Sequence, residues 1–110
     1  MDSATWTTIA RLVEWLDANN TNPPELTRLL RVIKIQEEAG EVAEAIHGAM
    51  GSNPRKGASH TWTDVEKELC DVILTSMVSL ATLNPDAQKV FEYHLNRVAE
   101  RSLDAAGPIA

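Results

Sequence analysis

Four acidic residues in the middle of the chain have the types and the spacing of a divalent-metal site. Glu38 and Glu41 stand three positions apart, and Glu68 and Asp71 repeat that spacing. Residues i and i+3 of an α-helix share one face, about 60° apart around the axis. Two antiparallel helices that present such pairs to each other would gather four like charges, an arrangement that needs a cation. Oxygen ligands suit Mg²⁺, with Mn²⁺ as a substitute, whereas zinc prefers Cys and His.

The neighbours of these acids decide between a metal site and a solvated surface. A Glu-x-x-Glu pair on a helix is usually just exposed to water. Here Val42 and Ala45 lie at angles close to the first pair, and Val65 and Val72 lie close to the second. The acids therefore border apolar faces, which favours a site between two helices.

Two further charged motifs lie near the first pair. Lys34 falls between Glu38 and Glu41 in angle, so it can bind a phosphate or form an i,i+4 ion pair with Glu38. Glu44-x-x-His47 is an element of di-iron bundles, but that architecture needs a second Glu-x-x-His, and the sequence has none. A ferritin-like carboxylate metalloprotein is therefore the weaker alternative.

Helical segments must position these side chains, and nothing in the sequence indicates a strand pair. The predicted helices cover about residues 3–18, 25–50, 63–83 and 85–103, with a loop at 51–60 and a frayed tail at 105–110. A capping box of Thr63 and Glu66 opens the third helix, and Asn84 caps the fourth. The prediction is one all-α domain over residues 1–110, a four-helix chain with the metal site between two antiparallel helices.

Two small residues within these helices carry predictions of their own. Gly40 costs about 1 kcal/mol relative to alanine, which suggests close packing against a neighbouring backbone. Cys70 points away from Glu68 and Asp71 and is predicted to be a small core residue.

The composition bounds the class of protein and of partner. A chain of 110 residues with 44% hydrophobic residues is typical of one soluble globular domain. No apolar run approaches the ~20 residues that span a bilayer, and the N-terminus lacks a secretory signal, so no membrane association is expected. The single cysteine permits no internal disulfide, and a cytoplasmic location is expected. The net charge of −6 argues against a nucleic-acid polymer as partner, although a bridging cation lets an acidic site accept nucleotide phosphates.

The acidic pattern as a whole resembles a known family. Glu37-Glu38-x-x-Glu41, followed after 26 residues by Glu68-x-x-Asp71, is similar to the signature of the MazG-like all-helical nucleoside triphosphate pyrophosphohydrolases. The match spans about residues 30–83 and includes the preceding lysine. The resemblance implies Mg²⁺ ligation by Glu38, Glu41, Glu68 and Asp71, with Glu37 as general base or as part of a second metal site.

The same resemblance implies an activity and further substrate contacts. The family hydrolyses nucleotides to a monophosphate and pyrophosphate, which suggests a housecleaning role in the nucleotide pool. Its members often carry Asn, Lys or Arg facing the substrate on the last helix, where this chain has Asn96, Arg97 and Arg101. The alternative for the two arginines is that they simply offset the helix dipole. Trp15 is a candidate for stacking on a base, against buried packing as the commoner fate of tryptophan.

Two questions stay open at the level of sequence. A non-catalytic, metal-stabilised helical interaction module would need four ligands but not the fifth acid, so Glu37 favours the enzyme. The resembled family forms dimers or tetramers, and a small core leaves an apolar stripe for a partner subunit, so a homodimer or homotetramer built as a helical bundle is expected. The alternative is that the first helix alone covers the stripe. Nothing in the sequence selects the base or the sugar of the nucleotide.

Overall fold

A computed structural model of the chain describes residues 1–104, and these residues are almost entirely helical. They form α1 (Ser3–Ala18), α2 (Pro24–Met50), α3 (Trp62–Leu83), α4 (Ala87–Ala99) and a π-helical turn, η1 (Glu100–Asp104), with no strand among them. The predicted all-α class is confirmed. The tail predicted at 105–110 lies outside the described residues. None of the helices within the described part combines the length and hydropathy that crossing a bilayer requires.

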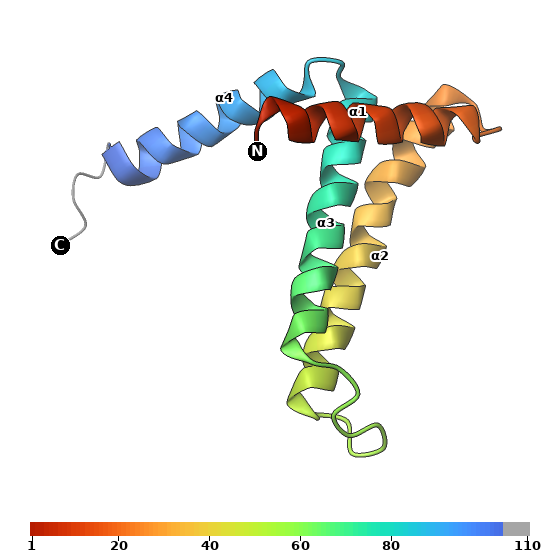
Figure 1. The fold of residues 1–110 in the computed structure, drawn as a ribbon, viewed down its shortest axis with the longest axis vertical. Coiled ribbons are helices and arrows are strands. Elements are labelled where there is room, and N and C mark those ends of the chain that lie inside the picture. Colours follow the sequence, from red (N-terminus) through yellow and green to blue (C-terminus); the bar gives the residue numbers. More distant parts are fainter. Residues whose placement is uncertain (105–110) are drawn as a thin grey trace.

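The helices are arranged as a T instead of a closed bundle (Figure 1). α2 and α3 run antiparallel, side by side, and form what we call the stem. α1 crosses one end of the stem, and α4 leaves the same end and points away from it. The radius of gyration is 17.6 Å, against about 13 Å for a compact domain of this length. Much of each helix is therefore not covered by the rest of the chain.

Local hydrogen bonds explain where the helices begin and end. The Asp2 carboxylate accepts from the Thr5 backbone N–H at 3.0 Å, which caps α1 and holds the pKa of Asp2 below its ordinary value. α2 ends at Gly51, whose φ of 61° is the left-handed conformation that glycine adopts at little cost.

The start of α3 differs from the prediction. The capping box consists of Thr61 and Asp64, not of Thr63 and Glu66. The Thr61 side chain accepts from the Asp64 N–H, while the Asp64 carboxylate accepts from the Thr61 N–H at 2.9 Å. Both pairs have the spacing of a capping box, but only the earlier one coincides with the change of backbone direction at the end of the loop.

The start of α4 is also later than predicted. Asn84 is the C-cap of α3, and its side-chain oxygen accepts from the Asp86 N–H at 2.8 Å. Asp86 is the N-cap of α4, so Pro85 lies in the connection instead of the first helical turn. At the other end, η1 continues the helical path to Asp104, close to the predicted end.

The buried apolar core lies where α1, α3 and α4 meet, and we call this region the corner. Trp6, Ile9, Met77 and Ala87 are buried there. Phe91 packs against them, with its ring 5.9 Å from that of Trp6. These contacts come from three helices, so the corner fixes their relative positions.

Arg31 joins the C-terminal end of α1 to the stem. Its guanidinium donates to Thr82 Oγ1 at 2.9 Å and to Asp17 Oδ1 at 2.8 Å, and its carbonyl accepts from Ser79 Oγ at 2.8 Å. One residue of α2 is thus bonded to α1 and, twice, to α3. These bonds set the register in which α2 and α3 run side by side.

Two predictions about small residues are wrong. Cys70 is exposed, because the stem is two helices thick and the face opposite the acids is surface, not core. A Cβ on Gly40 would meet no other element within 4 Å, so no neighbouring backbone packs against Gly40 among the described residues.

Candidate metal centre

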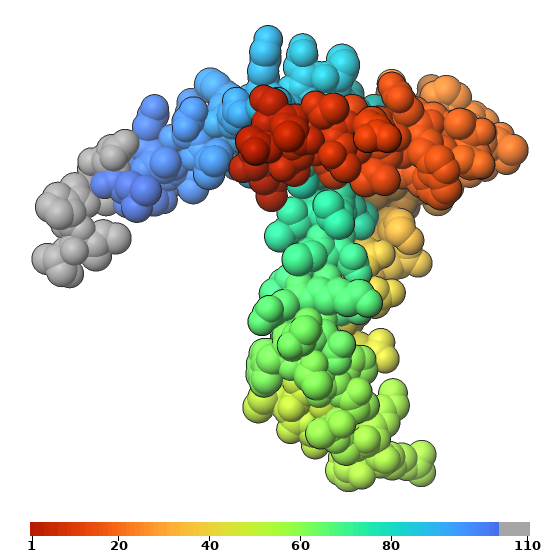
Figure 2. Space-filling model, viewed as in Figure 1, coloured from red at the N-terminus to blue at the C-terminus, as the bar shows by residue number. Residues whose placement is uncertain are grey.

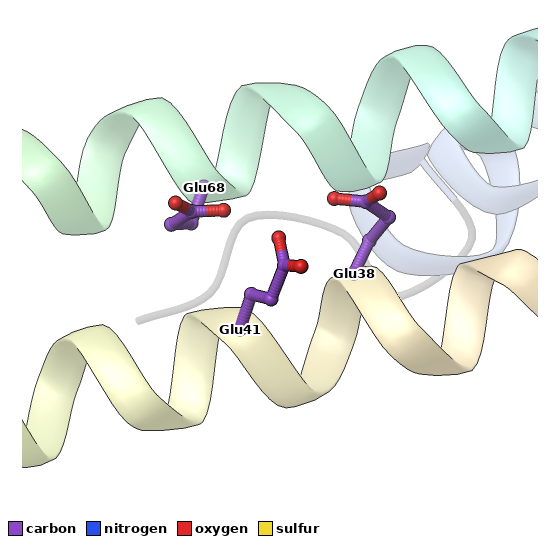
Figure 3. Close-up of side chains that lie close together, drawn as sticks. All are labelled: Glu38, Glu41 and Glu68. Atoms are coloured by element: carbon purple, nitrogen blue, oxygen red, sulfur yellow. The ribbon is translucent and has the colours of Figure 1, made fainter.

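Three of the four predicted metal ligands converge between the two helices of the stem. Glu38 and Glu41 extend from α2 and Glu68 extends from α3, and their carboxylates point into the space between the helices (Figure 3). Each offers an oxygen, and these oxygens lie within 4.8 Å of one another. We call these three residues the acidic cluster. The i, i+3 spacing gives α2 two carboxylates on one face, and the antiparallel packing brings the third to meet them.

Buried apolar side chains lie next to the acidic cluster on both helices. Ala45 and Val65 are buried, one turn from Glu41 and Glu68 respectively. The carboxylates next to them are therefore drawn partly out of water.

The environment of Glu38 shows the cost of gathering these charges. Its side chain is only 13% exposed. Desolvation raises the pKa of Glu38, and the negative charges of Glu41 and Asp71 raise it further, while Lys34 acts in the opposite direction. The folded chain thus disfavours the ionised form that a hard cation binds best.

Glu68 supplies an independent sign that the acidic cluster lacks a partner. Its Oε2 atom is buried and has no hydrogen-bond partner among the described residues. Buried polar atoms in folded proteins are nearly always satisfied, and an unsatisfied carboxylate oxygen is costly. A cation between the three carboxylates would satisfy it, and an all-oxygen donor set fits Mg²⁺ or Mn²⁺.

Asp71 and Glu37 occupy different positions relative to the acidic cluster. Asp71 is not one of the three residues that converge, but it is close enough for its charge to raise the pKa of Glu38. Glu37 is exposed and also lies outside the three. Within the described residues, the acidic cluster is thus a triad with Asp71 beside it.

Lys34 forms the ion pair with Glu38 that was one of its two predicted roles. Its Nζ lies 3.8 Å from Glu38 Oε1, an i,i+4 ion pair, and its side chain is 58% exposed. The ammonium group remains at the edge of the acidic cluster, within reach of a molecule bound there.

The remaining predicted substrate contacts are not brought to the acidic cluster. Asn96 and Arg97 lie on α4, and Arg101 lies on η1. We call α4 and η1 together the arm, which points away from the stem (Figure 1). Trp15 is 63% exposed and lines a small hollow where α1 meets the start of α2. The alternative prediction for Trp15, buried packing, is wrong, because the described residues leave the outer face of α1 uncovered.

The sequence reasoning missed a cavity at the far end of the stem. The connection from α2 to α3 and the end of α2 border an open pocket of about 730 Å³. The cavity lies against Glu44, His47 and Gly48 on α2, and His60 on the connection closes its other side. One available signal was the glycine at position 48: a Cβ there would overlap the His60 ring.

Comparisons of the whole chain with protein-family models, with curated proteins and with solved structures give no match.

Proposed function

We propose that the chain is a Mg²⁺-dependent nucleotide pyrophosphohydrolase, which cleaves a nucleoside triphosphate to the monophosphate and pyrophosphate. The observation that carries the proposal is the acidic cluster, with its unsatisfied, buried Glu68 oxygen. The resemblance of Glu37-Glu38-x-x-Glu41 and Glu68-x-x-Asp71 to the MazG-like enzymes supplies the reaction class. A cluster without a cation role would leave the desolvated Glu38 and Glu68 as an uncompensated cost.

Each acid then has a distinct role. Glu38, Glu41 and Glu68 would hold the cation, with the carboxylate of Asp71 nearby. A Mg²⁺ held there would supply charge neutralisation for the phosphate chain and a lowered pKa for the attacking water. Glu37 accepts the proton of that water, and Lys34 exchanges its ion pair with Glu38 for a phosphate oxygen. The chain offers no glycine-rich phosphate loop, so cationic side chains complete the grip.

The stem exposes an apolar stripe that a second copy of the chain would cover. Leu26, Leu29, Leu30 and Ile33 follow the i, i+3, i+4, i+7 spacing along α2, and all are exposed, Leu29 at 60% and Ile33 at 59%. Figure 2 shows the lower part of the stem extending clear of α1 and α4. Near the crossing, Leu30 lines a hollow together with Trp15 and Leu16 of α1, but Leu29 and Ile33 keep more than half of their surface exposed, so α1 leaves much of the stripe uncovered.

The total surface has the excess that a stable dimer requires. The chain exposes 8230 Å², whereas a compact monomer of this mass exposes about 6,000 Å². An excess of about 2,000 Å² per chain lies in the range that obligate homodimers bury. Two stems packed side by side would form a four-helix bundle, with two helices from each copy.

Assembly also gives the arm residues a route to a substrate. Asn96, Arg97 and Arg101 lie away from the acidic cluster of their own chain. In a dimer or tetramer, the arm of one copy would supply them to the nucleotide held by its partner. Mixing an Arg97→Ala variant with a Glu41→Gln variant should then restore part of the activity that each lacks alone.

A substrate panel tests the proposed reaction. Purified chain with Mg²⁺ is given nucleoside di- and triphosphates, and pyrophosphate and phosphate are measured separately. Pyrophosphate release that requires Mg²⁺ or Mn²⁺ is the expected result. Saturable Mg²⁺ binding without turnover of any nucleotide would leave the non-catalytic interaction module in its place, and Fe²⁺-dependent redox activity would point to the ferritin-like alternative.

Sedimentation tests the assembly. We expect a dimer or tetramer at micromolar concentration, with Ile33→Glu shifting it toward monomer because a charge would enter the apolar interface. Ile33→Leu is the matched control and should leave the assembly unchanged. Wild-type protein that sediments as a monomer would overturn the proposal.

A further inference from the structure

The cavity between the end of α2 and the connection to α3 has the size and lining of a small-molecule site. Its volume of about 730 Å³ falls within the range of about 300–1,000 Å³ for ligand pockets. Its wall combines two imidazole rings, His47 and His60, with the side chains of Asn53 and Lys56. Planar rings and a few polar groups together form the lining that binds small organic molecules.

The helix wall of this cavity is shaped by a glycine. A Cβ on Gly48 would overlap His60 Nδ1 and lie 2.6 Å from Ser59 Oγ. Gly48 is buried inside α2, where glycine costs about 1 kcal/mol relative to alanine. The same helix contains Gly40, where the Cβ position is open. The glycine at 48 is thus required by the approach of His60, and the two residues define the width of the cavity together.

The hydrogen bonds within the connection leave particular atoms for a ligand. His47 Nδ1 is 2.8 Å from Ser52 Oγ, and His60 Nδ1 is 2.9 Å from Ser59 Oγ. Both rings are thus held through Nδ1, which leaves Nε2 as the nitrogen that can meet a ligand. Asn53 accepts through Oδ1 from the Arg55 N–H at 3.0 Å, so its NH₂ group is the part left to donate.

The cavity begins where the acidic cluster ends. Glu44 lines the cavity and lies three residues beyond Glu41 on α2, on the same side of the helix. Gly48 is seven residues beyond Glu41, which corresponds to about 10 Å along the axis. A nucleotide whose phosphates lie at the acidic cluster can span that distance and place its base and sugar at the far end of the stem.

We propose that the cavity bounded by Gly48, Asn53 and His60 binds the nucleoside part of the substrate and sets its base preference. The proposal rests on the proposed function. The imidazole of His60 stacks on the base, because every base offers a π-face to a ring at the wall. The Asn53 amide and His47 Nε2 meet the base edge. Discrimination follows from these groups, since a polar site that meets an analogue lacking a partner atom is left unsatisfied.

The experiment compares substrates with and without a nucleoside. kcat and KM are measured with Mg²⁺ for purine and pyrimidine nucleoside triphosphates. Inorganic tripolyphosphate, which has the phosphate chain alone, is measured in parallel as substrate or as competitive inhibitor. His60→Ala removes a wall of the cavity, and Gly48→Ala pushes His60 out of place. Gly40→Ala is the matched control, since it makes the same change in the same helix at an open position.

The expected result is a loss specific to nucleotides. His60→Ala should raise KM for the preferred nucleotide about tenfold, the effect of one lost contact, and change the preference among bases. Its constants for tripolyphosphate should stay within about twofold. Gly48→Ala should act in the same direction, and Gly40→Ala should not. Equal losses for tripolyphosphate and nucleotides would mean that the connection grips phosphates, and unchanged constants for both would mean that the cavity is empty in the complex; either result overturns the proposal.

A binding measurement separates this proposal from the hydrolase itself. If the wild-type chain hydrolyses no nucleotide, the amide NMR signals of intact protein are followed as nucleoside monophosphates are added. Shifts centred on residues 47–60 that depend on the base, and that disappear in His60→Ala, would support a nucleoside site without the reaction. A full panel of purine and pyrimidine monophosphates that shifts none of these signals would exclude it.

Discussion

The corner and the stem are stabilised in different ways. In the corner, Trp6, Ile9 and Met77 are buried against one another from different helices. Around the acidic cluster of the stem, the buried apolar side chains are Ala45 and Val65, and three carboxylates converge beside them. The corner holds apolar side chains with one buried polar atom, Trp6 Nε1, that lacks a partner among the described residues, whereas the middle of the stem gathers three like charges beside the Lys34–Glu38 ion pair.

This difference assigns structure and chemistry to separate regions. Apolar burial stabilises the corner without any bound cation. The stem is less stable because it concentrates carboxylates, a cost in stability that is common at functional sites. Cation binding should therefore stabilise the stem through the acidic cluster, while the contribution of the corner stays the same.

The largest effect expected is the loss of turnover when a carboxylate of the stem is neutralised. Glu41→Gln or Asp71→Asn should reduce Mg²⁺-dependent pyrophosphate release by more than the ~10²–10⁴-fold typical of one proton-transfer group, because cation binding itself fails. Calorimetry should show that Mg²⁺ no longer raises the melting temperature. Glu14→Gln, on the exposed face of α1, is the control. Near wild-type activity of either stem variant at low Mg²⁺ would remove that residue from the ligand set.

A smaller loss is expected from the exposed acid next to the acidic cluster. Glu37→Gln should turn over ~10²–10⁴-fold more slowly with unchanged Mg²⁺ affinity, because the variant lacks the base that accepts the proton of water. kcat and metal affinity are measured on the same preparation. Weakened affinity that excess Mg²⁺ partly rescues would instead make Glu37 a ligand of a second ion. No change in either quantity would return it to the solvated surface.

In the corner the expected effect is on stability alone. Ile9 is 1% exposed, so Ile9→Ala should lower the free energy of unfolding by about 2–5 kcal/mol. The stabilisation by Mg²⁺ should be the same as in wild type, since the acidic cluster is untouched. Chemical denaturation with and without Mg²⁺ measures both quantities, and Leu12→Ala on the same helix, at a more exposed site, should cost less. A Mg²⁺ effect that disappears in Ile9→Ala would show that corner and stem are coupled.

The smallest effect expected is that of Glu38→Gln on stability, which should have opposite signs without and with Mg²⁺. Glu38 has a raised pKa in the folded chain because of burial and its acidic neighbours. Its contribution to stability is therefore greatest below the unfolded pKa of about 4.3 and is lost as the pH rises through the folded value. Glu38→Gln should make the metal-free protein more stable at pH 7, with no difference from wild type at low pH. In saturating Mg²⁺ the variant should be the less stable of the two. Thermal melts at several pH values test this, and a metal-free variant that is less stable at pH 7 would mean that the Lys34 ion pair outweighs the repulsion.

Local patterns were enough to predict the helices and the faces of the acids. The span 3–18 matches α1, because the Asn19–Asn22 run stops the helix by short-range interactions alone. The i, i+3 rule placed Glu38 and Glu41 together for the same reason. The N-cap of α3 was predicted two residues late, at Thr63 instead of Thr61, since both threonines fit a capping box and local sequence does not choose between them.

The sequence by itself determined the all-α class, the helical spans to within a few residues, and the pairing of carboxylates on each helix, because these depend on interactions within one or two turns. Only the tertiary structure decided which acids meet. The register set by Arg31 brings Glu68, but not Asp71, into the triad. The tertiary structure also decided that Cys70 is exposed and that the cavity beside His60 exists. Both depend on how many helices surround a given face and on where the connection between α2 and α3 returns, and neither is encoded in the spacing along one helix.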